Sequence, residues 1–264
     1  MCFKTYQFNM LNYQFFKSDK KETLVLLHGF CENISVFNHQ ITALQTSFNL
    51  LCIDLPGFGL SAVIKDITIP KMAEEVKLVI DYLEINNCVL LGHSMGGYVT
   101  LAFAKKYSQL LNGFGLLHST AAKDNFERLG KRKQLINFIK KNGSETFFKT
   151  FFPDLFFDKE LNKTQINELI ENANATDSNG IIEAIKAMMM REETFDVLET
   201  TQLPVFFAIG KHDSIITEND MFGQAARCNQ SEICYLENSN HLGMVEQPTI
   251  LNDAIIKFVN RISI

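Results

Sequence analysis

The segment GHSMGG at residues 92–97 places a serine between two glycines in the pattern G-x-S-x-G. The apolar run CVLL precedes it and YVTLAFAKKY, which is typical of a helix, follows it. This context predicts a tight strand-to-helix turn, in which Gly92 and Gly96 avoid side-chain collisions. A serine hydroxyl on such a turn can attack a carbonyl carbon once a base takes its proton. Ser94 is therefore a candidate nucleophile.

The base has to come from six histidines. His241 is the strongest candidate, because ENSNHLGMVEQP is a polar segment between the last predicted strand and the last predicted helix. That position lies at the carboxyl edge of a parallel sheet, where such sites assemble. His93 is expected to point to the opposite side of its strand, and His212 to point away from its neighbour Asp213. The remaining histidines are His28, which is expected to support its loop by hydrogen bonding, His39, in a predicted helix, and His118.

The base needs a carboxylate that fixes its tautomer and stabilises the imidazolium. Asp213 ends the predicted strand PVFFAIGKHD, at the same edge as His241. Glu218 and Asp220 are close in sequence, but they begin the next predicted helix, where acidic residues serve as caps or dipole partners. The order Ser94, Asp213, His241 is the order that accompanies a G-x-S-x-G turn in a parallel sheet.

Two backbone N–H groups are candidates for an oxyanion hole. Met95 follows the serine and begins a helix, whose N-terminus favours negative charge. Phe30 follows the glycine of HGF, in the loop after the strand TLVLLHG, and its ring is also a candidate for lining an acyl pocket.

Short apolar runs alternate with helical patterns, which predicts an α/β fold with a mostly parallel, doubly wound sheet. A leading antiparallel hairpin is expected at residues 5–16. The predicted strands occupy residues 23–29, 49–57, 88–94, 113–119, 204–210 and 232–238, and the predicted helices occupy residues 71–85, 96–107, 218–227 and 249–259.

The alternation stops between residues 120 and 200, where only helical patterns occur, such as Phe126, Leu129, Ile136 and Ile139. We predict an α/β core from residues 1–119 and 201–264, with residues 120–200 inserted as a helical lid. Phenylalanines crowd residues 147–157, and three methionines follow at residues 188–190. Core packing explains most such stripes, but some rings could face the serine and form an apolar pocket. The candidates for that pocket are Phe151, Phe152 and Met188.

The first part of the lid is basic. It carries Lys123, Arg128, Lys131, Arg132, Lys133, Lys140 and Lys141 against Asp124 and Glu127. Two interpretations stay open, a solvated helix face and a site for anionic substrates or partners.

Composition excludes several classes of protein. The 264 residues carry a net charge of −5, which gives no electrostatic footprint for nucleic acid. The six cysteines have no metal-binding spacing, and a reducing cytosol is their natural setting. Neither a signal peptide nor a membrane-spanning apolar stretch is recognisable. We expect a soluble, cytoplasmic monomer or homodimer that acts on a small ester-like molecule, without membrane, metal or cofactor.

Five motifs occur in a familiar order, namely HGF, DLPGFGLS, GHSMGG, GKHD and NHLGMVEQP. Through them the chain resembles the α/β-hydrolase superfamily across nearly its whole length outside the lid. Within it, the chain is similar to small-lid carboxylesterases, enol-lactonases and C–C hydrolases. Haloalkane dehalogenases and epoxide hydrolases of this fold use aspartate where Ser94 stands. The prolyl aminopeptidase branch favours a tryptophan near its serine, and this chain has none.

The resemblance implies hydrolysis of small to medium apolar carboxylic esters through an acyl-serine. Lactones, thioesters and C–C bonds remain open, because the same triad cleaves them. A ligand-binding signalling protein on this scaffold is the alternative from another class. By the same resemblance Arg191 is structural, paired with a carboxylate such as Asp196, or else it binds a substrate carboxylate.

Overall fold

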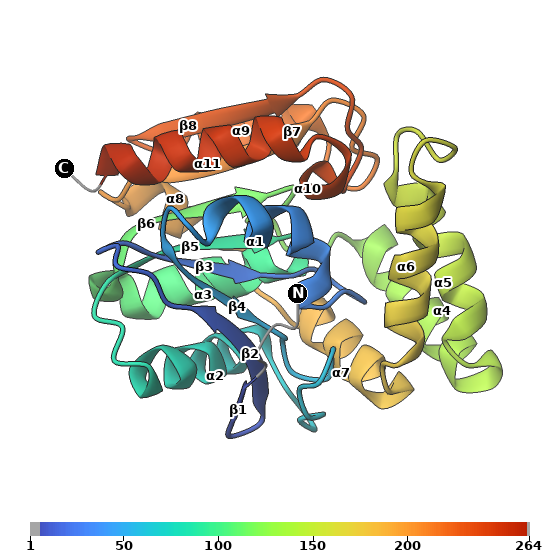
Figure 1. Ribbon diagram of the computed structural model, residues 1–264. Helices are drawn as coiled ribbons and strands as arrows, with labels where there is room; N and C mark the ends of the chain where they lie inside the picture. Colours follow the sequence, from blue (N-terminus) through green and yellow to red (C-terminus); the bar gives the residue numbers. More distant parts are fainter. Residues whose placement is uncertain (1–5, 263–264) are drawn as a thin grey trace.

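The structure is a computed structural model that describes residues 6–262. Its centre is an eight-stranded sheet with the order β1-β2-β4-β3-β5-β6-β7-β8 (Figure 1). β1 and β2 form an antiparallel hairpin, β2 pairs antiparallel with β4, and all other neighbours are parallel. The strands are β1 (Tyr6–Phe8), β2 (Leu11–Phe16), β3 (Thr23–Leu27), β4 (Asn49–Ile53), β5 (Cys88–His93), β6 (Leu111–Leu117), β7 (Val205–Gly210) and β8 (Ser231–Leu236).

This arrangement confirms the predicted α/β class and its mostly parallel sheet. β3, β5 and β7 are buried along their whole length, as the continuous apolar runs indicated. β8 lies at the edge, and its residues are more exposed. The predicted leading hairpin is present, although its first residue, Thr5, lies outside the described residues.

Helices cover both faces of the sheet (Figure 1). On one face α1 (Asn38–Leu44) packs against α11 (Pro248–Ile262), and on the other α2 (Ile69–Tyr82) packs against α3 (Met95–Tyr107). Thr68 and Thr217 cap α2 and α9 (Glu218–Ala225) through their side-chain oxygens, as helix N-termini require. The shorter helices of this part are η1 (Ile34–Phe37), η2 (Ser108–Leu110) and α10 (Gly243–Glu246).

Residues 118–204, all of them described, contain helices and no strand. Figure 1 shows α4, α5 and α6 grouped to one side of the sheet. The helical pattern predicted from Phe126, Leu129, Ile136 and Ile139 lies within a single helix, in which Ile139 is buried and Phe126 is 93% exposed. The helices are α4 (Phe126–Asn142), α5 (Glu145–Phe151), η3 (Pro153–Leu155), α6 (Lys163–Asn174), α7 (Ser178–Met189) and α8 (Phe195–Thr200). Within residues 6–262, none of the helices has the combined length and apolar character that a membrane crossing demands.

Candidate active site

Ser94 lies on a strained turn between β5 and α3. Its backbone has φ 48° and ψ −112°, a region that residues other than glycine rarely enter. Its N–H donates to Leu117 O at 2.9 Å, and its carbonyl accepts from Ser119 Oγ at 2.7 Å. The turn is also crowded, since a Cβ on Gly92 would lie 2.2 Å from the carbonyl oxygen of Gly96. Surrounding contacts therefore hold the serine in a conformation of the kind that clusters at functional sites.

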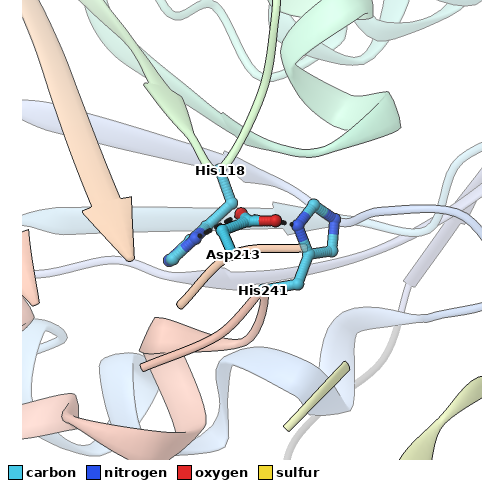
Figure 2. Close-up of side chains that lie close together, drawn as sticks. All are labelled: His118, Asp213 and His241. Carbon is cyan, nitrogen blue, oxygen red and sulfur yellow. Dashed lines mark hydrogen bonds and ion pairs between the residues drawn. The ribbon is translucent and has the colours of Figure 1, made fainter. Parts of the chain in front are cut away.

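Asp213 and His241 meet at the carboxyl edge of the sheet (Figure 2). His241 Nδ1 lies 2.9 Å from Asp213 Oδ2. The other carboxylate oxygen accepts the backbone N–H groups of Ile215 and Ile216, each at 2.9 Å. Burial raises the pKa of Asp213, but the facing His241 and the histidine hydrogen bonds lower it more, so the net pKa lies below its ordinary value. The carboxylate is thus ionised and saturated with donors.

His118 is the functional candidate to which sequence reasoning gave no role. It follows β6, adopts φ 50°, and is fully buried. Its Nδ1 lies 3.1 Å from Asp213 Oδ2, and its Nε2 accepts the backbone N–H of Gly243 at 3.2 Å. Because Nε2 is an acceptor, the ring proton is on Nδ1 and is donated to the aspartate. A Cβ on Gly243 would lie 2.5 Å from this ring, so the glycine makes room for it.

A second buried pair, His93 and Glu32, contacts the backbone of His241. His93 Nδ1 lies 2.9 Å from Glu32 Oε2, and His93 Nε2 lies 2.9 Å from the carbonyl oxygen of His241. An ionised Glu32 and the carbonyl oxygen both accept hydrogen bonds, an arrangement that suits a ring protonated on both nitrogens. Burial lowers the pKa of His93, but Glu32 raises it more and leaves it above its ordinary value. Glu32 also accepts from Gly29 N at 2.7 Å, which ties the HGF loop to this pair.

The buried, neutral His118 makes folding sensitive to acid. Burial lowers its pKa from 6.5 to about 4, against the raising effect of Asp213. Between pH 6.5 and about 4 the His118 imidazole is protonated in the unfolded chain and neutral in the folded chain. The folded state therefore loses stability as the pH falls. We expect this residue to remove about 3 kcal/mol of unfolding free energy between pH 7 and pH 4. Urea denaturation at pH 7, 5.5 and 4 should show a shallower decline in His118→Gln; identical declines would contradict the expectation.

Ser94 and His241 line the same cavity, which has a volume of about 200 Å³. Within the described chain no hydrogen bond joins the Ser94 hydroxyl to His241; such contacts often tighten only when substrate binds. The cavity wall is mostly apolar, with a basic segment on one side. The lining residues are Phe30, Glu32, Ser94, Tyr98, Arg128, Lys131, Arg132, Phe151, Leu155, Met188, Ile215 and His241.

The structure divides the predicted pocket residues into two groups. Phe30, Phe151 and Met188 line the cavity with Ser94. Phe152 does not; it is fully buried and packs against Phe148 and Phe151.

Arg191 also lies outside this cavity. Its Nη1 pairs with Asp124 at 2.9 Å, and its Nη2 donates to the carbonyl oxygen of Ala122 at 2.8 Å. The expected pairing with Asp196 is wrong, because Asp196 pairs with Lys105. The Arg191 guanidinium also stacks over the Tyr98 ring, 4.1 Å from its centroid. It also lines a second, mostly apolar cavity of about 600 Å³.

The loops on either side of the site are fixed by hydrogen bonds. His28 accepts the N–H of Leu55 on Nε2 at 2.9 Å, and its Nδ1 lies 2.7 Å from Gly29 O. This is the loop-supporting role expected for His28.

Met95 is the first residue of α3, so its N–H has no partner inside the helix.

His118, Asp213 and His241 also bring potential metal-ligating atoms within 4.8 Å of one another. The hydrogen bonds account for this closeness, since both ring nitrogens of His118 are already engaged. A metal ion here would have to displace the Asp213 and Gly243 contacts.

A family model described as alpha/beta hydrolase fold matches residues 22–156, about half of the chain. The chain belongs to the α/β-hydrolase family. This α/β hydrolase is similar to the hydrolase YugF from Bacillus subtilis, with 23% identity over 94% of this chain and 93% of the relative. It is also similar to 3-oxoadipate enol-lactonase 2 from Acinetobacter baylyi, with 24% identity over 95% and 93% of the two chains.

Among solved structures, the α/β hydrolase superposes on a thermophilic esterase from Thermogutta terrifontis with a TM-score of 0.90. The two chains are 26% identical, and the match covers 96% of this chain and 94% of the esterase. Family and relatives together support an enzyme of the α/β-hydrolase type.

Proposed function

We propose that this α/β hydrolase cleaves carboxylic esters of short acyl groups through an acyl-serine intermediate. One observation carries the proposal: Ser94 on its strained turn and His241, held by Asp213, line a single cavity. The similarity to an esterase and an enol-lactonase supports acyl transfer as the chemistry.

In the proposed acylation step, Ser94 Oγ attacks the ester carbonyl carbon while His241 Nε2 takes the hydroxyl proton. Asp213 accepts the Nδ1–H of His241, which leaves Nε2 free to act as the base. The backbone N–H groups of Phe30 and Met95 stabilise the oxyanion. His241 then returns the proton to the leaving alkoxide, so an alcohol departs and the acyl group stays on the serine.

In the deacylation step, water attacks the acyl-serine, and His241 again accepts the proton. Collapse of the second oxyanion releases the carboxylic acid and restores the Ser94 hydroxyl. Each step draws on side chains and backbone of this chain.

His118 is a positioning residue in this mechanism. It shares Asp213 Oδ2 with His241, at 3.1 Å and 2.9 Å respectively. Its proton is fixed on Nδ1 by the Gly243 N–H, so it cannot act as a base toward Asp213. It therefore helps to orient the carboxylate, while Asp213 Oδ2 still accepts the Nδ1–H of His241.

The helices of residues 120–200 act as the lid in this proposal. α4 contributes Arg128, Lys131 and Arg132 to the cavity wall, while Phe151 of α5 and Met188 of α7 supply apolar surface. At about 200 Å³ the cavity is smaller than typical drug-sized ligand pockets, which favours short acyl groups.

Lactones, thioesters and C–C bonds are the alternative substrates within the enzyme class. The similarity to an enol-lactonase supports the lactone among them. A panel of phenyl butyrate, its thioester and a six-membered lactone tests them by comparing kcat/KM. The highest value on the oxygen ester supports the proposal. Binding of these compounds without turnover would favour a ligand-binding signalling protein instead.

Acyl-chain length gives a sharper prediction. Each added methylene should gain about 0.8 kcal/mol, roughly fourfold in kcat/KM, until the cavity is full. We expect p-nitrophenyl esters to improve from acetyl to butyryl or hexanoyl, and then to decline. Phe151→Ala should move the optimum to longer chains, because it removes a ring from the cavity wall.

The matched control is Phe157→Ala, since the Phe157 ring is 46% exposed and stacks on His212 away from the cavity. It should leave the optimum unchanged. Melting temperatures are measured for both variants, because removing the half-buried Phe151 ring also loses packing contacts and lowers stability. A wild-type profile that rises through dodecanoyl would contradict a cavity that is filled by a short acyl chain.

A further inference from the structure

The structure divides the basic part of the lid into two sets. Arg128, Lys131 and Arg132 line the cavity that holds Ser94 and His241. Their spacing of three and four residues places them on one face of α4. We call these three residues the cationic rim. The exposed residues Lys123, Lys133, Lys140 and Lys141 do not line that cavity and are solvated.

The cationic rim carries more positive charge than its neighbours neutralise. Asp124 is shared between Arg132, at 2.5 Å, and Arg191, at 2.9 Å. Glu127 pairs with Lys131 on the exposed surface at 2.7 Å. Of the other carboxylates near the cavity, Glu32 is matched by His93, and Asp213 accepts from His118 and His241.

Arg128 carries the unmatched charge. Its Nη2 donates to the carbonyl oxygen of Ile215, and among the described residues no carboxylate lies within ion-pair distance of it. Ile215 follows Asp213 by two residues, so this hydrogen bond fastens α4 to the loop that holds the acid. An arginine has five N–H donors in a planar fork, so Arg128 keeps donors for a ligand in the cavity.

We propose that the preferred substrate of the site is a short ester that carries a carboxylate, bound by the cationic rim with Arg128 as its main contact. A carboxylate fits because its two oxygens match the guanidinium fork, and the partly desolvated cavity strengthens the pairing. The apolar wall formed by Phe30, Phe151 and Met188 packs the short chain between this charge and Ser94. This inference rests on the proposed ester hydrolysis at Ser94.

Two isosteric substrate pairs test the proposal, and each differs only in carboxylate against carboxamide. One pair carries the group on the acyl side, monophenyl glutarate against phenyl glutaramate. The other carries it on the alcohol side, 4-carboxyphenyl butyrate against 4-carbamoylphenyl butyrate. Rates without enzyme are subtracted, because a neighbouring carboxylate can assist hydrolysis. We expect kcat/KM at least tenfold higher for the carboxylate in one pair, and that pair identifies the half of the ester beneath α4.

Arg128→Gln should reduce this preference by about 10- to 100-fold, because it removes a hydrogen bond between two charged groups. Lys133→Gln is the matched control: it makes the same charge change on the same helix, outside the cavity. It should leave the preference intact. Lys131→Gln, at an exposed position, gives a second variant should Arg128→Gln fail to fold, and it should lower the preference about two- to fivefold.

The outcomes separate the two levels of inference. Hydrolysis of phenyl butyrate with no carboxylate preference in either pair overturns the cationic rim and leaves ester hydrolysis standing. A preference that survives both Arg128→Gln and Lys131→Gln overturns the rim as well. Failure to hydrolyse any ester in the two pairs overturns the proposed function itself.

Discussion

Replacing Ser94 by alanine is expected to lower kcat on phenyl butyrate by about 10⁶, the loss that follows removal of the serine in related triads. The reason is that acylation then has no hydroxyl to deprotonate, while the other groups of the site remain. An alkyl fluorophosphonate should add one adduct to the wild-type chain, on the peptide that carries Ser94, and none to the variant. Intact mass and peptide mapping read out both results.

Ser119→Ala is the matched control, because Ser119 Oγ donates to the carbonyl oxygen of Ser94 at 2.7 Å and has no place in the proposed chemistry. It should still take the adduct on Ser94, with a modest loss of rate. Circular dichroism and melting establish that both variants are folded. An adduct on another residue, or turnover that survives in Ser94→Ala, would refute the nucleophile.

Most of the fold could be predicted because parallel strands leave a clear pattern. β3, β5 and β7 are buried on both faces, so their sequences are apolar without interruption. The ends of the strands were predicted less exactly. The apolar run at residues 49–57 contains a strand only over Asn49–Ile53. The polypeptide turns away there, and apolar residues beyond the strand, such as Leu55 and Phe58, are buried by the loop instead.

The proximity of Asp213 and His241 could also be predicted, since each follows a strand of the same parallel sheet. His118 follows β6 at the same edge, but two features of its environment have no local signal. Its contact with Asp213 crosses from one strand end to the next, and its proton position depends on the N–H of Gly243, 125 residues away. Such a role depends on three-dimensional contacts that spacing does not encode.

The direction of side chains within the helices of residues 118–204 could not be predicted either. Phe151 and Phe152 are adjacent and chemically identical, yet Phe151 lines the cavity and Phe152 is buried between helices. A single residue step turns a helix by about 100°, so composition cannot separate them. The ion-pair partner of Arg191 was predicted wrongly for a similar reason. Asp196 is near Arg191 in sequence, but Asp124 is the carboxylate near it in space.

Asp213→Asn should lower kcat by about 10⁴, although the carboxamide has the same shape as the carboxylate. The carboxamide oxygen can accept the N–H groups of Ile215 and Ile216, which turns the NH₂ toward the two histidines. His118 cannot accept it, since Gly243 holds its proton on Nδ1. His241 must therefore accept on Nδ1 and carry its proton on Nε2, the tautomer that cannot deprotonate Ser94.

Asp220→Asn is the control for this substitution, because Asp220 is the neighbouring acid that caps α9 with Thr217. It should leave kcat unchanged at the cost of a small loss in melting temperature. Fluorophosphonate labelling of Ser94 should slow in Asp213→Asn and not in Asp220→Asn, because labelling also needs the serine proton removed. Should Asp220→Asn show the large loss instead, the acid has been misassigned. A loss below tenfold in Asp213→Asn would mean that His241 keeps its working tautomer without the carboxylate.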